Sequence, residues 1–111
     1  MSERAPTPLT PAVFHVLLAL SDGESHGYAI MKRVEEDSGL KMGPGTIDGS
    51  LQRLTDAGWV TETAEAAVDG DARRGRVFAL TDAGAEALSA EARRIRRLAE
   101  LSGMRELAAR G

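Results

Sequence analysis

The apolar side chains of this chain are almost all aliphatic, because its 111 residues include one Trp, one Tyr, two Phe and no Cys. A chain of this length builds one small domain with a single core, and a core rich in Leu, Val and Ala favours helices. The absence of cysteine excludes disulfide scaffolds, thiolate zinc sites and cysteine nucleophiles. We therefore expect a mainly helical protein of a reducing compartment, by default the cytoplasm.

Three helices are predicted in the first half of the chain from start signals, end signals and apolar spacing. Thr10 followed by Pro11 begins the first helix, and Gly43 followed by Pro44 begins the third. Proline suits these positions because the N–H it lacks has no partner at the start of a helix. The second helix ends at Gly39. The apolar stripes are Val13, Leu17 and Leu20, then Ile30 and Val34, then Ile47, Leu51 and Leu54.

A turn, a hairpin and a last helix complete the predicted order. The polar cluster at residues 21–25 predicts a turn before the second helix. Strand-like residues at 59–64 and 76–80 predict a two-stranded hairpin with a mobile tip. Thr81 is expected to cap a last helix, which Gly103 weakens or ends.

This order predicts a mainly α protein with a small β-hairpin, which is a winged helix-turn-helix followed by a C-terminal dimerisation helix. In such a domain the third helix enters the DNA major groove, and the hairpin lies along the backbone or a minor groove. The expected divisions are a flexible arm at 1–8, the winged domain at 9–80 and the dimerisation helix at 81–111. Neither an apolar run of ~20 residues nor a signal peptide is present, so no membrane association is expected.

Five short motifs, in this order, resemble the PadR-like family of transcriptional regulators. They are His26-Gly27-Tyr28, Gly43-Pro44-Gly45-Thr46-Ile47, Ser50-Leu51-Gln52-Arg53-Leu54, Ala57-Gly58-Trp59-Val60 and Leu80-Thr81-Asp82-Ala83-Gly84. The resemblance covers residues 9–90 and implies a cytoplasmic homodimer that binds a pseudo-palindromic operator and represses transcription. Many members respond to a small apolar or aromatic effector, but no aromatic residue follows Phe78, so no effector is identified.

The predicted DNA contacts come from the second helix, the outward face of the third helix and the hairpin. Arg53 is expected to bind guanine or a phosphate, and the alternative is a pair inside the helix, with a neighbour of Gly49 or with Asp56. The hairpin arginines are expected to reach phosphates or a minor groove, and the alternative is a solvated loop. The full set is Tyr28, Thr46, Ser50, Gln52, Arg53, Arg73, Arg74 and Arg76.

Several members of this set have a structural alternative. Tyr28 is either a phosphate contact or partly buried in the core, and Ser50 lies at the edge of the buried stripe. Thr46 either donates to a phosphate or ties up a backbone group in the first helical turn. Trp59 is assigned to packing the hairpin onto the helices. Gly45 and Gly49 lower helix propensity, and close docking of another surface is the favoured reason; both lie in the third helix.

The charge balance favours a second hypothesis, a winged-helix protein-interaction module with weak or no DNA binding. The formal net charge is −3. Asp48 stands where the family usually has tyrosine, on the flank of the third helix. A carboxylate there is repelled by phosphate unless it faces a protein cation or a base amine, and the sequence leaves both possibilities open.

The last helix carries an apolar side that needs a covering surface. The predicted dimerisation residues are Leu88, Ala92, Ile95, Leu98 and Ala99. A symmetric dimer would cover this side and set two recognition helices roughly 34 Å apart. The alternative is packing back on its own domain through the first helix, and the two are compatible.

No catalytic, metal or cofactor site is predicted. His15 and His26 lack the spacing of a metal site, and the glycines beside Pro44 miss the dinucleotide-binding pattern. No serine, lysine or carboxylate pair stands in a nucleophile arrangement, so an enzyme is not expected.

Overall fold

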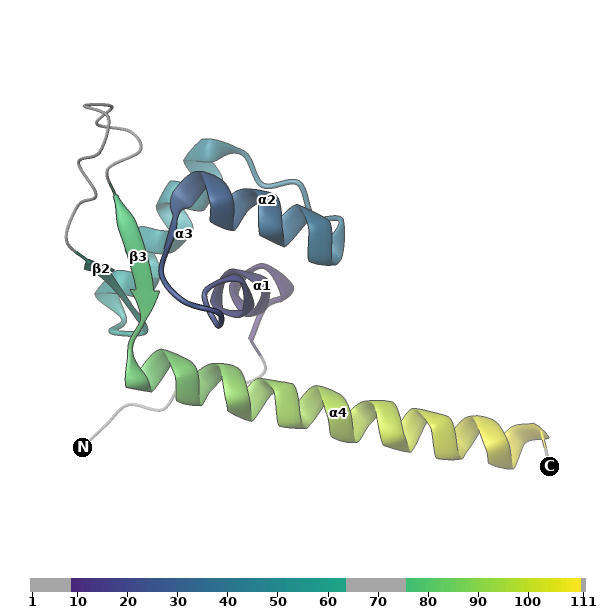
Figure 1. Cartoon of the computed structure of the whole chain (residues 1–111). Coiled ribbons are helices and arrows are strands. Elements are labelled where there is room, and N and C mark those ends of the chain that lie inside the picture. The colour runs from purple at the N-terminus through teal and green to yellow at the C-terminus, as the bar shows by residue number, and fades with distance from the viewer. Residues whose placement is uncertain (1–8, 64–75, 111) are drawn as a thin grey trace.

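The computed structural model describes residues 9–63 and 76–110, and the side chains of those residues as far as Arg105. Its elements are α1 (Pro11–Ala19), β1 (Ser25–His26), α2 (Gly27–Ser38), α3 (Pro44–Asp56), β2 (Val60–Thr63), β3 (Val77–Leu80) and α4 (Asp82–Arg110). The first three helices and the small sheet form one body, and α4 runs along it and projects beyond it (Figure 1). This is the predicted order of elements with one additional strand.

The predicted helix starts and the predicted end of α2 are confirmed. Thr10 Oγ1 accepts a hydrogen bond from the backbone N–H of Val13 at 3.2 Å, which caps α1. Gly43 precedes α3, which begins at Pro44. Gly39 ends α2 with φ of +79°, a left-handed conformation that glycine adopts without a steric penalty.

The predicted hairpin is confirmed as the antiparallel pair β2 and β3, and β1 joins it to make a three-stranded sheet of order β1-β3-β2. Ser25 pairs with Phe78, and Val60 pairs with Leu80. The two residues of β1 extend from the segment predicted as a turn. A two-residue strand has no periodicity of its own, so it forms only because β3 offers it a free edge. We call β2, β3 and the residues between them the wing, of which residues 64–75 lie outside the described part.

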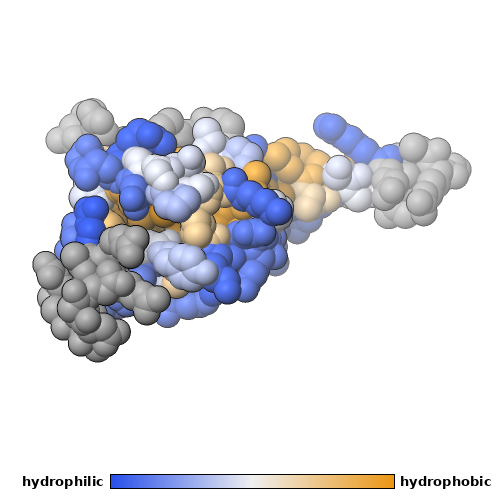
Figure 2. Space-filling model, turned by 90° about the horizontal axis from the view of Figure 1, so that it is seen from above, coloured by the Kyte–Doolittle hydropathy of each residue, from blue (hydrophilic) through white to orange (hydrophobic). Residues whose placement is uncertain are grey.

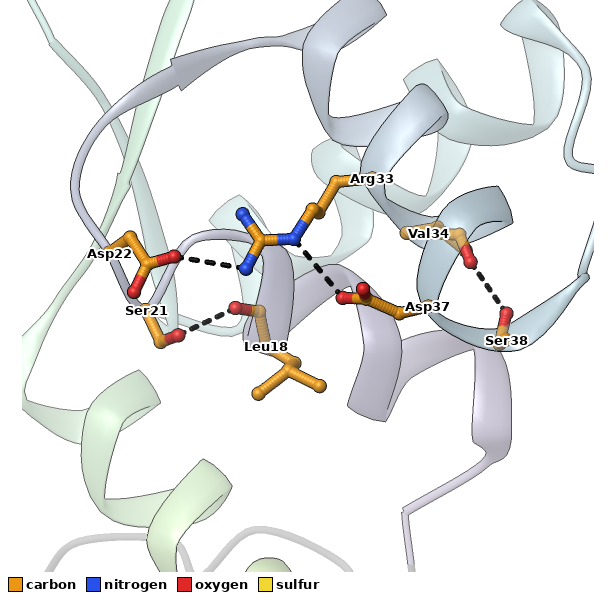
Figure 3. Close-up of polar contacts among 7 residues, drawn as sticks. All are labelled: Leu18, Ser21, Asp22, Arg33, Val34, Asp37 and Ser38. Carbon is orange, nitrogen blue, oxygen red and sulfur yellow. Dashed lines mark hydrogen bonds and ion pairs between the residues drawn. The ribbon is translucent and has the colours of Figure 1, made fainter.

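A charged network joins the turn after α1 to α2. Arg33 Nη2 donates to Asp22 at 3.0 Å, and Arg33 Nε donates to Asp37 at 3.2 Å (Figure 3). These hydrogen bonds, first that with Asp22, raise the pKa of Arg33 above its ordinary value. Because the partners are largely exposed, the network fixes geometry more than it adds stability.

The core is mainly aliphatic and lies between α1, α2, α3, the sheet and the first part of α4. Its most deeply buried apolar residues are Val16, Leu17, Ile30, Val34, Ile47, Leu51 and Val60. Trp59 is 9% exposed and belongs to the same cluster, so its predicted packing role is confirmed. The predicted stripes of the first three helices therefore meet in one core.

The start of α4 is hydrogen-bonded to the segment between α3 and β2. Thr81 Oγ1 accepts from the backbone N–H of Gly84 at 3.0 Å, so the predicted cap is confirmed. The same hydroxyl donates to the carbonyl of Gly58 at 2.6 Å, and the Thr81 N–H donates to the carbonyl of Trp59 at 3.0 Å. Gly84 lies so close to Trp59 that an added Cβ would overlap the Trp59 carbonyl.

Gly103 does not end the last helix, because α4 continues to Arg110, and the expectation that it weakens the helix stays a prediction. One glycine costs a helix about 1 kcal/mol relative to alanine, and the good helix formers on both sides outweigh this. Within the described residues, no helix combines the length and apolarity needed to cross a membrane.

One carboxylate of α4 is buried. Glu91 is 2% exposed and accepts two hydrogen bonds from Arg94, at 3.0 Å from Nε and 2.7 Å from Nη2. Arg94 lowers the pKa of Glu91 below its ordinary value, and a hydrogen bond from the Leu9 backbone adds to this effect against the opposing effect of burial.

This pair predicts a loss of stability in acid. A lowered pKa means that Glu91 stabilises the fold fully above its unfolded value of about 4.3, and that this contribution is lost as the pH falls through the folded value. The melting temperature of Glu91→Gln should therefore lie below that of the wild type at pH 7, with a gap that closes below about pH 4. Glu86→Gln, on an exposed position of α4, is the control. A gap that is independent of pH would contradict the prediction.

Candidate nucleic-acid interface

Helix α3 has a buried face and an exposed face. Ile47, Leu51 and Leu54 join the core and are each at most 5% exposed. The predicted contacts on the exposed face are Thr46, Gln52 and Arg53. An exposed polar face of this kind beside a wing has the form that winged domains place in a major groove.

Ser50 does not lie on that exposed face. It is 4% exposed, and its hydroxyl accepts a hydrogen bond from Arg53 Nη2 at 3.3 Å. Its position at the edge of the apolar stripe buries it against the core, which leaves almost none of its surface for a contact with DNA. The predicted DNA contact of Ser50 is therefore corrected to a contact that orients Arg53.

The polar side chains on the exposed face of α3 also contact one another. Gln52 Nε2 donates to Asp56 Oδ1 at 3.0 Å, while Arg53 is held by Ser50. Arg53 thus has an intrahelical partner, as the alternative hypothesis had it, and among the described residues that partner is Ser50, a neighbour of Gly49, and not Asp56. Arg53 keeps donors for an outside acceptor, because Ser50 occupies one of its five N–H groups.

Two glycines leave open space on α3. A Cβ added to Gly45 would meet no atom within 4 Å, and one added to Gly49 would meet Arg53 Nη1 at an ordinary 3.6 Å. Packing within the described chain therefore does not require glycine at either position. The hypothesis that another surface docks closely here stays a prediction.

Tyr28 stands in the first turn of α2 with its ring in solvent. It is 67% exposed, so the alternative that the core partly buries it is wrong. The Nζ atom of Lys32 lies 5.9 Å from its ring centroid. The ammonium group thus lies over the exposed ring, and both the ammonium and the tyrosine hydroxyl are hydrogen-bond donors.

Of the predicted wing contacts, Arg76 is described and Arg73 and Arg74 lie outside the described residues. Arg76 donates to both carboxylate oxygens of Glu62, from Nε at 3.1 Å and from Nη2 at 3.0 Å. Its guanidinium carbon lies 5.3 Å from the ring centroid of Phe78. The hydrogen bond to Glu62 is the main cause of a raised pKa of Arg76.

Sequence reasoning missed Glu62. The signal lies in the strand register: Glu62 pairs with Phe78, and side chains two residues apart in a strand share a face. Glu62, Phe78 and Arg76 therefore stand on the same face of the wing. The register depends on how β2 and β3 align, which the residue types alone leave open.

Asp48 is exposed on α3, and its charge is a further cause of the raised pKa of Arg76. Arg76 therefore acts electrostatically on this carboxylate, but the two form no ion pair among the described residues. Asp48 and Arg76 place opposite charges on either side of the junction between α3 and the wing.

Replacing Asp48 tests whether its charge opposes DNA. If it faces phosphate, the repulsion is only partly screened across a Debye length of roughly 8 Å, so Asp48→Asn should bind random DNA more tightly. If the carboxylate instead accepts from a base amine, the variant should lose affinity for a selected operator by about 1–3 kcal/mol. Titrations with both DNAs distinguish the outcomes, and unchanged binding to both would remove Asp48 from recognition.

The apolar side of α4 divides into a buried part and an exposed part. Leu88 is 9% exposed and lies in the core of its own domain, which corrects its assignment to a dimer contact. Ile95 and Leu98 are 42% and 48% exposed. Ala92 and Ala99 are exposed as well. Figure 2 shows this apolar surface continuing onto the projecting part of α4.

A shallow groove between α1 and α4 adjoins the exposed apolar side of α4. It is lined by Leu9, Pro11, Phe14, His15, Glu91, Arg94 and Ile95. Ile95 thus belongs both to the groove and to the exposed side of α4. Within the described parts of the chain, no three His, Asp or Glu side chains gather closely enough to hold a metal ion.

Three helices, a small antiparallel sheet and a long final helix define a winged helix-turn-helix protein, in which α3 carries an exposed polar face. The chain belongs to the PadR-like family of transcriptional regulators, whose family model matches residues 16–90. This is a family of regulators and not of enzymes.

Solved structures are similar to this chain over most of its length. A PadR family transcription regulator from Clostridium difficile R20291 superposes with a TM-score of 0.71 at 20% identity, over 83% of this chain and 94% of the other. Bacillus subtilis PadR, solved in complex with operator DNA, has a TM-score of 0.62 at 27% identity and is matched over 74% of this chain. The matched part is 45% of that regulator.

A protein of Streptomyces fradiae is more similar in sequence. It is described as an uncharacterized 37.1 kDa protein in transposon TN4556, and it is 43% identical over 83 residues, or 75% of this chain. The match spans 22% of that protein.

Proposed function

We propose that this chain binds operator DNA as a homodimer in the cytoplasm and represses transcription by excluding polymerase. The observation that carries the proposal is the exposed polar face of α3, with Arg53 oriented by Ser50 at 3.3 Å and the wing arginine Arg76 nearby. The operator complex of the Bacillus subtilis relative supports the same mode of binding.

The proposed dimer rests on the apolar side of α4. Ile95 and Leu98 expose large side chains on a helix that projects beyond the body of the domain (Figure 1). A second copy would cover this surface by the same residues, as two-fold symmetry requires. It would also present two copies of α3 to successive major grooves, roughly 34 Å apart.

The test is the selection of bound fragments from the host genome, followed by titration of the enriched sequence. Affinity should fall as salt rises, with a slope of about −0.9 for each phosphate contact. An enriched sequence with two-fold symmetry supports the dimer, and repression of a reporter that carries it supports the regulatory sign. A chain that enriches no sequence would contradict the proposal.

Acidic residues near the interface favour a second candidate, a protein-interaction module. Asp48, Asp56 and Glu62 are all exposed on α3 or the wing, and the chain has a net charge of −3. A surface of this kind binds DNA only if local arginines outweigh it. The fragment selection separates the candidates, because an interaction module would leave the genomic DNA unselected.

A further inference from the structure

Arg76 is oriented by two neighbours on the same face of the wing. Glu62 accepts from Arg76 Nε at 3.1 Å and from Nη2 at 3.0 Å, which is a two-point contact that fixes the plane of the guanidinium. Phe78 lies beneath it, with its ring centroid 5.3 Å from the guanidinium carbon. Since Phe78 is 4% exposed and part of the core, the surface on which the guanidinium rests is rigid.

This geometry leaves one edge of the guanidinium for another acceptor. Arginine has five N–H donors in a fixed fork, and Glu62 takes the Nε donor and one Nη2 donor. The other three, two of them on Nη1, point away from Glu62. The Arg76 side chain is 51% exposed, so these donors are accessible from outside the chain.

The guanidinium is held by Glu62 of β2, the strand that packs against α3. Asp48 on α3 acts electrostatically on Arg76, and Phe78, over whose ring the guanidinium lies, is part of the core. The oriented donors are therefore at the junction of α3 and the wing, where a winged domain meets DNA.

We propose that Glu62 is a positioning residue for DNA binding: with Phe78 it holds Arg76 so that the remaining donors of the guanidinium meet an acceptor on DNA. This inference rests on the proposed function. The acceptor is a phosphate oxygen or an acceptor on a base edge, which share the same hydrogen-bond chemistry. Glu62 acts through Arg76 and does not touch the DNA.

The opposing possibility is that Glu62 masks Arg76. In favour of positioning, a carboxylate that orders the arginine before binding reduces the side-chain entropy lost on binding, which corresponds to about two- to tenfold in affinity. The same carboxylate also neutralises the arginine and is itself repelled by phosphate. The two effects have opposite signs, so their balance is measurable.

A double-mutant cycle isolates that balance. Glu62→Gln, Arg76→Gln and the double variant are titrated against a selected operator and against random DNA of the same length, with thermal unfolding as a check of the fold. The effect of Glu62→Gln in the Arg76→Gln background reports repulsion between the carboxylate and DNA alone. The difference between the two backgrounds is the coupling.

If Glu62 positions Arg76, Glu62→Gln should lower the operator affinity when Arg76 is present. This loss should be about two- to tenfold larger than the change that Glu62→Gln causes in the Arg76→Gln background. Arg76→Lys should bind as weakly as Arg76→Gln to within about threefold, because lysine keeps the charge but has no planar fork. Glu86→Gln, an equal change of charge on α4, should show no coupling with Arg76. Equal losses of affinity for the operator and for random DNA identify the acceptor as a phosphate, whereas a loss confined to the operator identifies it as a base edge.

The results that overturn the inference are distinct from those that overturn the proposed function. Positioning is excluded if the coupling between Glu62 and Arg76 is zero. It is also excluded if Glu62→Gln binds the operator more tightly, only in the presence of Arg76, and with a salt slope steeper by about one phosphate contact. In both cases operator binding itself stands. A wild-type chain that binds neither DNA removes the proposed function and this inference with it.

Discussion

Ile95→Asp combined with Leu98→Asp is expected to convert the proposed dimer into a folded monomer. Both side chains are large, apolar and nearly half exposed on α4. In a symmetric interface each substitution occurs twice, so four unpaired carboxylates would be buried, which is strongly unfavourable. Sedimentation should show the monomer mass. Operator affinity should fall by about 100- to 10,000-fold, because the two half-sites then bind independently.

A charge-matched control separates loss of the interface from a change in net charge. Ser89→Asp combined with Arg97→Ser makes the chain equally more acidic at exposed positions of the same helix, away from the Ile95 side. This variant should remain dimeric. Circular dichroism must show that both variants are helical. If the Ile95 and Leu98 variant stays dimeric and folded, the interface lies elsewhere, and the α1 side is the next surface to test.

Gly84→Ala is expected to destabilise the domain by about 1–3 kcal/mol, as overpacking of a tight contact does. The new Cβ would overlap the carbonyl of Trp59. That carbonyl accepts from Thr81 at 3.0 Å, and Trp59 itself is in the core. The overlap can be relieved only by moving the start of α4 away from the sheet. Urea denaturation should therefore show a lower midpoint than that of the wild type.

Gly103→Ala is the matched control for this substitution. It is the same change in the same helix, but a Cβ at Gly103 meets no atom within 4 Å. It should raise stability by up to about 1 kcal/mol through helix propensity. Opposite signs at the two positions would tie the cost at Gly84 to the contact with Trp59. A stabilising Gly84→Ala would contradict the close packing.

The helices of this protein follow from local signals in the sequence. Thr10 and Gly43 each precede a proline, and each begins a helix where predicted. Gly39 ends α2 because a left-handed residue is needed there. Such signals work without tertiary structure, since they satisfy or remove backbone hydrogen bonds within a few residues. The ordered motifs also sufficed to predict the winged fold.

The correct assignment of individual site residues depended on which side chains are buried. The helical wheel predicted burial correctly in the middle of an apolar stripe but not at its edge. Ile47, Leu51 and Leu54 are in the core as expected, whereas Ser50 at the edge of the stripe proved to be buried. Leu88 likewise lies in its own domain, although the same periodicity continues to exposed residues farther along α4. The packing of the other elements, and not the sequence of the helix itself, decides how much of α4 is covered by the domain and where its exposed part begins.

The sequence by itself determined the helix starts, the order of elements and the family, because these depend on signals between residues close in the chain. Only the tertiary structure decided that Ser25 and His26 add a strand, that Glu91 is buried, and that Glu62 holds Arg76. Glu62 and Arg76 are 14 residues apart, and β1 is far in sequence from its partner β3. Such contacts form when separate elements pack against one another, since strand register and helix docking bring together groups that no local pattern connects.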